Sequence, residues 1–159
     1  MDKRIVDLHV HSTESDGTFT PEELVTEALH AGLCAFALTD HDTIGGIAAA
    51  KAAARETGLT VIPGIELSCY NDDHEVHMVG LFIDETNAAF KESLKSVQDS
   101  REERQMKELA AELDLAVSGG SDFHGANKPK IHLGTGKGSL FVPYAVFEHL
   151  KSLKEAHSN

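Results

Sequence analysis

The chain has 159 residues with 14 Lys and Arg against 26 Asp and Glu, a formal net charge of −12, and 10 His. A chain of this length can bury roughly two thirds of its extended surface, so we expect a single domain over residues 1–159. The acid excess and the lack of a basic run argue against binding of duplex DNA, which needs a broad cationic face.

The first residues do not resemble a secretory signal, because Asp7 and His9 interrupt the apolar run. No segment approaches the ~20 apolar residues that a membrane helix requires. We therefore expect a cytoplasmic protein that does not bind a membrane. Cys34 and Cys69 lie in apolar surroundings, which favours a packing role over a redox role for both thiols.

Short apolar strands alternate with helices, which predicts an α/β domain with mostly parallel strands. The first helix has a capping box, with Thr20 as N-cap, Pro21 as first residue and Glu23 as reciprocal partner. Gly32 ends it. In chain order the predicted elements are a strand over residues 4–9, this helix, a strand over 35–38, a helix over 44–57, a strand over 60–63, a hairpin of 65–70 with 75–83, a helix over 85–114, a strand over 115–117 and a helix after Pro143.

Acidic residues and histidines collect where the predicted strands end. They are His9, His11 and Asp16; Asp40, His41 and Asp42; Glu66; His74 and His77; and Asp122 and His124. Side chains two residues apart on a strand point to the same face, so His9 with His11 and Asp122 with His124 can each present two ligands to one side. A sheet or barrel would bring these strand ends together.

Imidazole and carboxylate ligands without thiolate suit Zn, Mn, Fe or Ni, and several carboxylates would offset the charge of more than one divalent ion. Two ions about 3.5 to 4 Å apart, bridged by a carboxylate and a water, can attack phosphate or carbonyl centres.

Each group alone has a plainer interpretation. His9 and His11 could be polar strand caps, Asp16 a turn residue and Glu66 a solvated strand residue. His74 fits a hairpin turn better than a ligand role. The joint occurrence at five strand ends nevertheless favours metal. The histidines outside this pattern, which we assign to surface or packing roles, are His30, His132, His149 and His157.

Five motifs together resemble the PHP (polymerase and histidinol phosphatase) family. They are Asp7-Leu8-His9-Val10-His11-Ser12 with Ser15-Asp16-Gly17, Leu38-Thr39-Asp40-His41-Asp42-Thr43, Pro63-Gly64-Ile65-Glu66, Glu75-Val76-His77-Met78-Val79-Gly80, and Gly120-Ser121-Asp122-Phe123-His124-Gly125. The chain looks most like the bacterial stand-alone members that hydrolyse nucleoside 3′,5′-bisphosphates and trim the 5′ ends of short RNA.

The resemblance implies a shortened, distorted (β/α)7-type barrel with a metal site at the carboxyl ends of its strands, and a metal-bridging hydroxide that attacks phosphorus. It implies that His9, His11, Glu66 and Asp122 hold one ion, that Glu66 bridges to a second ion bound by His77, and that Asp16, His41 and His124 hold a third. Glu66, Asp122 and His124 take the catalytic role. Asp7 and Asp40 are expected to orient the ligand imidazoles.

The chain departs from similar full-length enzymes in one respect: their helical insertion, which supplies a further histidine and phosphate-binding basic residues, is absent between about 105 and 115. The second ion is therefore left with Glu66 and His77 alone. Lys128 and Lys130 are candidate contacts for substrate phosphate, with a solvated loop as the alternative. Arg101 and Arg104 could act likewise, or pair with neighbouring Glu on a solvated helix.

The leading hypothesis is a metal-dependent phosphoesterase that uses two to three divalent transition metal ions (Zn, Mn or Fe). Its substrate would be a small phosphorylated compound such as a nucleotide, a nucleoside bisphosphate or an oligonucleotide end. The alternative is a shortened, catalytically weak metal-binding module that binds a phosphorylated ligand or a partner. Metal-dependent amide hydrolysis ranks last, because no lysine occupies a convincing bridging position. A homo-oligomer is left open.

Overall fold

The computed structural model describes residues 4–71, 74–99 and 118–157. Strands and helices alternate within these residues, which confirms the α/β class. The elements are β1 (Ile5–Val10), α1 (Pro21–His30), β2 (Leu33–Leu38), α2 (Ile47–Ala54), β3 (Thr60–Asn71), β4 (His74–Leu81), α3 (Ala88–Asp99), the 3₁₀ turn η1 (Gly125–Asn127) and α5 (Tyr144–His157).

The four strands form one sheet in the order β1-β2-β3-β4. The first three strands are parallel, and the register aligns their carboxyl ends, with Val10 opposite Leu38 and Leu38 opposite Pro63. Strand β4 returns antiparallel to β3, pairing from Gly64 with Leu81 to Asn71 with His74. The hairpin therefore extends β3 beyond the edge where the parallel strands end.

The prediction of separate strands over 60–63 and 65–70 is wrong. Strand β3 continues through Gly64 without interruption. Gly64 is needed for close approach rather than for a turn. A Cβ at this position would lie 2.8 Å from the Thr39 Cγ2 atom and 3.0 Å from the Leu38 carbonyl oxygen. The missing side chain thus lets the long strand pass the end of β2.

The helices follow their capping signals. The predicted capping box of α1 is confirmed: Glu23 N–H donates to Thr20 Oγ1 at 3.2 Å and Thr20 N–H donates to Glu23 Oε2 at 2.9 Å. Helix α2 is shorter than the predicted 44–57, beginning at Ile47 and ending at Ala54. Its N-cap is Gly46, which offers no capping side chain, so the glycine pair before Ile47 delays the helix.

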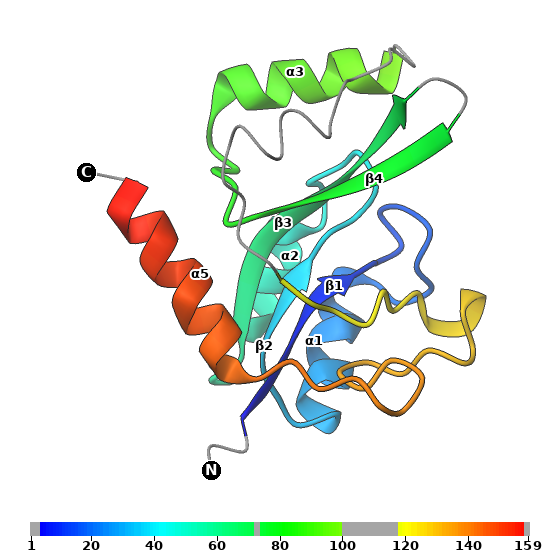
Figure 1. The fold of residues 1–159 in the computed structure, drawn as a ribbon, viewed down its shortest axis with the longest axis vertical. Helices are drawn as coiled ribbons and strands as arrows, with labels where there is room; N and C mark the ends of the chain where they lie inside the picture. The colour runs from blue at the N-terminus through cyan, green and yellow to red at the C-terminus, as the bar shows by residue number, and fades with distance from the viewer. Residues whose placement is uncertain (1–3, 72–73, 100–117, 158–159) are drawn as a thin grey trace.

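Helices cover both faces of the sheet (Figure 1). Helices α1 and α2 pack on one face, against a core that includes Phe36 and Leu38. Helix α5 covers the other face through Phe147 and Leu150. The residues that they meet there are Val6, Leu8, Ala35, Ala37 and Ile62, and the two alanines leave room for the helix. The described sheet is a curled half-barrel, which agrees with the expected shortened, distorted barrel.

The segment from Gly119 to Phe123 runs beside β1 and takes the place of a further strand. Leu8 N–H donates to Gly119 O at 3.3 Å, Asp122 N–H to His9 O at 2.9 Å, and His11 N–H to Phe123 O at 3.0 Å. These bonds hold Asp122 and His124 next to the end of β1. The segment is not a regular strand, because Asp122 has a φ of +58°, which L residues rarely adopt.

Several sequence predictions lie outside the described residues. They are the later part of the helix over 85–114, the strand over 115–117, the roles of Arg101 and Arg104, the absent insertion and the side chain of Cys69. The single domain over residues 1–159 also stays a prediction. Within the described ranges, no helix combines the length and the apolar character needed to cross a membrane.

We predict that Gly120→Ala destabilises the fold far more than Gly119→Ala. A Cβ at Gly120 would press on the main-chain N and Cα of His9, whereas a Cβ at Gly119 meets only the Val142 side chain, at 3.3 Å. Forced overpacking costs about 1–3 kcal/mol. Urea unfolding of the two variants measures the difference, and equal stabilities would contradict the close packing of this segment on β1.

Candidate metal centre

The structure brings the eight predicted ligands together above the carboxyl ends of β1 and β2. Glu66 and His77 lie inside β3 and β4, whereas the sequence analysis placed them at strand ends. The extended hairpin places them: Glu66 N–H donates to Asp40 O at 3.2 Å, and Asp42 N–H donates to Glu66 O at 2.9 Å. These two bonds fix β3 against the loop that carries His41.

The carboxylate of Glu66 lies at the centre of the cluster, with only 4% of its side chain exposed. Its Oε2 atom is 2.7 Å from His9 Nε2 and 2.9 Å from His11 Nε2, and its Oε1 atom is 3.0 Å from His77 Nδ1. His41 Nε2 is 3.6 Å from Oε2. Burial alone would raise the pKa of Glu66, but the imidazoles of His11 and His9 outweigh it and hold that pKa well below its usual range.

The potential ligand atoms fall into three groups, each with its atoms within 4.8 Å of one another. The first consists of His9, His11, Glu66 and Asp122, the second of His41, Glu66 and His77, and the third of His11, Asp16, His41 and His124. The groups contain the expected sets, and His41 additionally joins Glu66 and His77. The second group thus has three donors where the sequence indicated two. Sequence reasoning missed the contact of His41, in the loop after β2, with Glu66 of β3, because it arises from an isolated bridge between the two residues.

Several buried imidazole nitrogens have no hydrogen-bond partner in the described part of the chain: both ring nitrogens of His11, Nδ1 of His41 and Nε2 of His124. His11 Nε2 lies 2.9 Å from Glu66 and His124 Nε2 lies 3.1 Å from Asp16, but neither contact has hydrogen-bond geometry. An unpaired buried polar atom costs about 1–3 kcal/mol. These ring nitrogens lie close to carboxylate oxygens without forming hydrogen bonds to them. Such an arrangement fits a cation that both kinds of atom bind.

The protonation states also suit metal ligands. His124 Nδ1 donates to the Asp122 carbonyl at 2.9 Å, which leaves the lone pair on Nε2, the atom beside Asp16. Burial lowers the pKa of His11, so this imidazole favours the neutral form that binds metal. Burial also opposes protonation of His9, but its hydrogen bond and ion pair with Glu66 raise the pKa of His9 overall.

Asp7 and Asp40 accept hydrogen bonds from main-chain N–H groups and from serine hydroxyls near the ligands. Asp7 accepts from the N–H groups of Ser121 at 2.7 Å, Gly134 at 2.7 Å and His9 at 3.3 Å. Asp40 accepts from Ser12 N–H at 2.6 Å and from two serine hydroxyls. The carboxylates therefore fix the chain around His9, His11 and Asp122, which orients the imidazoles indirectly.

The two lysines predicted to contact phosphate, Lys128 and Lys130, have different surroundings. The Lys128 ammonium donates to Asp122 Oδ2 at 2.7 Å, while Asp122 Oδ1 is 3.5 Å from His11 Nε2. Lys128 thus turns the free carboxylate oxygen toward the first group. Lys130 is exposed on the following turn. Sequence reasoning missed Asn127, whose amide donates to the main-chain oxygen of Asp16 at 2.6 Å and ties the two loops together.

Comparison with known proteins agrees with this geometry. The PHP domain family model matches residues 7–122. The chain is 42% identical over 121 residues to a 3′,5′-nucleoside bisphosphate phosphatase of Chromobacterium violaceum, covering 76% of this chain and 42% of the relative. It is 43% identical over 102 residues to a 5′-3′ exoribonuclease of Escherichia coli, covering 63% and 35%.

Two solved structures have similar folds. One is an amidohydrolase from Chromobacterium violaceum with bound sulfate and no metal, with a TM-score of 0.57 and 34% identity over 92% of this chain and 49% of that protein. The other, from Bifidobacterium adolescentis, is assigned as a metal-dependent phosphoesterase, with a TM-score of 0.57 and 33% identity over 71% and 39%. The chain spans less than half the length of each of these relatives.

We predict that Asp7→Asn destabilises the protein by about 2 kcal/mol, because an amide NH₂ would face a buried N–H donor of Ser121 or Gly134. Asp84→Asn is the matched control, since Asp84 is exposed and accepts its hydrogen bonds from Thr86 N–H and Oγ1 in the same turn. Chemical denaturation measures both variants. Equal stability of the two variants would contradict the supporting role of Asp7.

Proposed function

The chain belongs to the PHP domain family, and on this basis we propose that it is a metal-dependent phosphoesterase. The observation that carries the proposal is the convergence of three ligand groups on one buried carboxylate, Glu66, with unpaired imidazole nitrogens around it. Histidine and carboxylate donors are the set that Zn, Mn and Fe accept. We propose that the chain binds two to three such ions, with one ion in each occupied ligand group.

The site has a buried floor and an open rim. The side chains of His11 and His124 are 0% and 1% exposed, whereas those of Asp16, His77 and Asp122 are 55%, 40% and 43% exposed. A substrate would therefore approach from the rim, with ligands held rigidly beneath it. When bound, divalent ions offset the charge of a phosphate and activate a water as nucleophile.

This chain's own residues would bind and orient these components. Glu66 belongs to the first and second ligand groups, Asp122 belongs to the first and His124 belongs to the third, with Asp122 Oδ1 3.4 Å from His124 Nδ1. We assign the catalytic role to these three residues. Lys128 stands at the rim beside Asp122, and we propose that Lys128 and Lys130 contact the substrate phosphate, where cations favour the developing negative charge.

The proposed substrate is a small phosphorylated compound: a nucleotide, a nucleoside bisphosphate or an oligonucleotide end. The names of the two relatives that act on such compounds support this class. The net charge of −12 speaks against a duplex as substrate. The second candidate is a metal-binding module that binds phosphorylated ligands without turnover. We include it because the chain matches only 42% of the length of the phosphatase.

We predict that Glu66→Ala lowers the metal content more than His77→Ala. Glu66 belongs to two ligand groups and His77 to one, so the first variant weakens two sites and the second weakens one. His30→Ala, at a histidine that is 72% exposed on α1, is the matched control and leaves the content unchanged. Elemental analysis after dialysis against limiting Zn²⁺ or Mn²⁺ gives the number of bound ions. Equal losses in the two variants would contradict the shared position of Glu66.

We predict phosphate release from a nucleoside 3′,5′-bisphosphate in the presence of Mn²⁺ or Zn²⁺, and its loss in His9→Ala and Asp122→Ala, which remove ligands of the first group. Lys137→Ala, on an exposed turn, is the control and retains turnover. Activity that survives both ligand substitutions would refute the assignment. Binding of metal and phosphate without hydrolysis across nucleotides and sugar phosphates would favour the binding module.

A further inference from the structure

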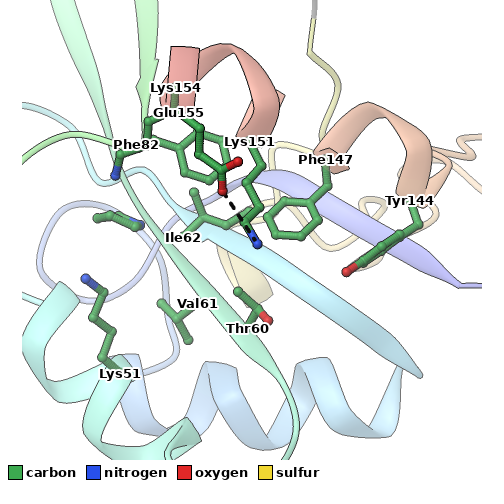
Figure 2. Close-up of a pocket in the computed structure, with 11 residues that line it drawn as sticks. Lys51, Thr60, Val61, Ile62, Phe82, Tyr144, Phe147, Lys151, Lys154 and Glu155 are labelled. Atoms are coloured by element: carbon green, nitrogen blue, oxygen red, sulfur yellow. Dashed lines mark ion pairs between the residues drawn. The ribbon is translucent and has the colours of Figure 1, made fainter. Parts of the chain in front are cut away.

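The lysines of this molecule have partners of two kinds. A groove of about 720 Å³ runs beside residues 60–63 of β3, and none of the eight predicted metal ligands lines it. There Lys151 forms an ion pair with Glu155, at 4.0 Å, on its own helix α5 (Figure 2). Lys128 differs, because its partner Asp122 is one of the predicted ligands. The charge of Lys128 therefore bears on the metal centre itself.

The two oxygens of the Asp122 carboxylate have different neighbours. Oδ2 accepts a hydrogen bond from the Lys128 ammonium at 2.7 Å. Oδ1 lies 3.6 Å from His9 Nε2 and 3.5 Å from His11 Nε2, the ring nitrogens of the first ligand group. A divalent cation in this group and the ammonium of Lys128 would therefore share one carboxylate.

The charge of Lys128 opposes such a cation. Two cations on one carboxylate repel each other, and solvent screens this repulsion only in part at a side chain that is 43% exposed. The main chain of Asp122 is held without Lys128, because its N–H donates to His9 O at 2.9 Å and its carbonyl oxygen accepts from His124 Nδ1 at 2.9 Å. Either oxygen of the carboxylate can serve as the ligand. Removal of the ammonium charge should therefore favour the cation rather than misplace its ligand.

An anion at the rim can draw the ammonium away from Asp122. The side chain of Lys128 is 42% exposed, and its ammonium stands on a flexible four-carbon stem. Its main chain is fixed, since the N–H of Lys128 donates to Gly125 O at 3.2 Å. The preceding residue, Asn127, donates its amide to Asp16 O at 2.6 Å. Lys128 is thus anchored between the loops that carry Asp16 and Asp122, the two exposed carboxylates of the ligand groups.

We propose that Lys128 couples the binding of a divalent cation to the binding of a phosphate, an inference that rests on the proposed function. In the absence of an anion, the ammonium pairs with Asp122 and weakens the first ligand group. A phosphate at the rim takes over the ammonium, which leaves Asp122 to the cation and offsets the repulsion. Each ligand then raises the affinity of the other by the same factor. The site therefore holds its cation most tightly when a phosphorylated compound is present.

The test measures the affinity of the whole chain for Mn²⁺, from the electron paramagnetic resonance signal of the free ion, with and without inorganic phosphate. Lys128→Met keeps the length of the side chain and removes its charge. Without phosphate, this variant should bind Mn²⁺ roughly tenfold more tightly than the wild type. Lys128→Arg keeps the charge and should resemble the wild type. Lys137→Met is the matched control, because it removes a lysine charge on an exposed turn, and it should leave the affinity unchanged.

The measurement with phosphate separates coupling from charge removal alone. Phosphate should raise the Mn²⁺ affinity of the wild type and of Lys137→Met by a larger factor than that of Lys128→Met, which has lost the exchange of partners. Direct contact between Mn²⁺ and phosphate is common to all variants and cancels in this comparison.

The outcomes also distinguish this inference from the proposed function. Weaker Mn²⁺ binding by Lys128→Met, an affinity equal to that of Lys137→Met, or an equal effect of phosphate on these two variants would overturn the inference alone. A wild-type chain that binds no Mn²⁺ under either condition would overturn the proposed function and the inference together.

Discussion

A buried carboxylate surrounded by imidazoles is the constraint on which the rest of this structure depends. Glu66 is almost inaccessible, yet four histidines from three parts of the chain direct ring nitrogens at it within 3.6 Å. Such crowding of polar groups in a buried place is costly unless every lone pair finds a partner. A divalent cation would satisfy that requirement, because it accepts imidazole and carboxylate lone pairs together.

Much of the fold can be understood as the scaffold for this arrangement. The continuous strand β3 raises Glu66 beyond the parallel edge, and the absent side chain of Gly64 allows it to pass β2. Asp7 ties β1 to the segment that carries Asp122, and Asp40 ties the loop after β1 to the end of β2. Helix α5 on the opposite face of the sheet from α1 and α2 completes the core.

The sequence predicted the α/β class and the capping box of α1, because these depend on local patterns. The eight candidate ligands that it named lie close together, and their metal-binding role stays a prediction. The sequence did not predict that β3 is continuous, because Gly64 indicated a break between two strands. Only the tertiary structure shows that Gly64 lies within one strand. The contact of His41 with Glu66 and the bond of Lys128 to Asp122 likewise arise from tertiary packing. Asp122 and His124 face the same site, as the spacing predicted, with Asp122 Oδ1 3.4 Å from His124 Nδ1, although the positive φ of Asp122 shows that this segment is not a regular strand.

The most direct measurement is anomalous diffraction from crystals grown with Zn²⁺ or Mn²⁺, recorded above and below the absorption edge of the metal. We predict a peak bounded by Glu66, His9, His11 and Asp122, with further density toward His77 or toward Asp16 and His124. The contrary result is a centre without anomalous density at saturating metal, in which the buried imidazoles of His11 and His124 have formed hydrogen bonds with the neighbouring carboxylates instead.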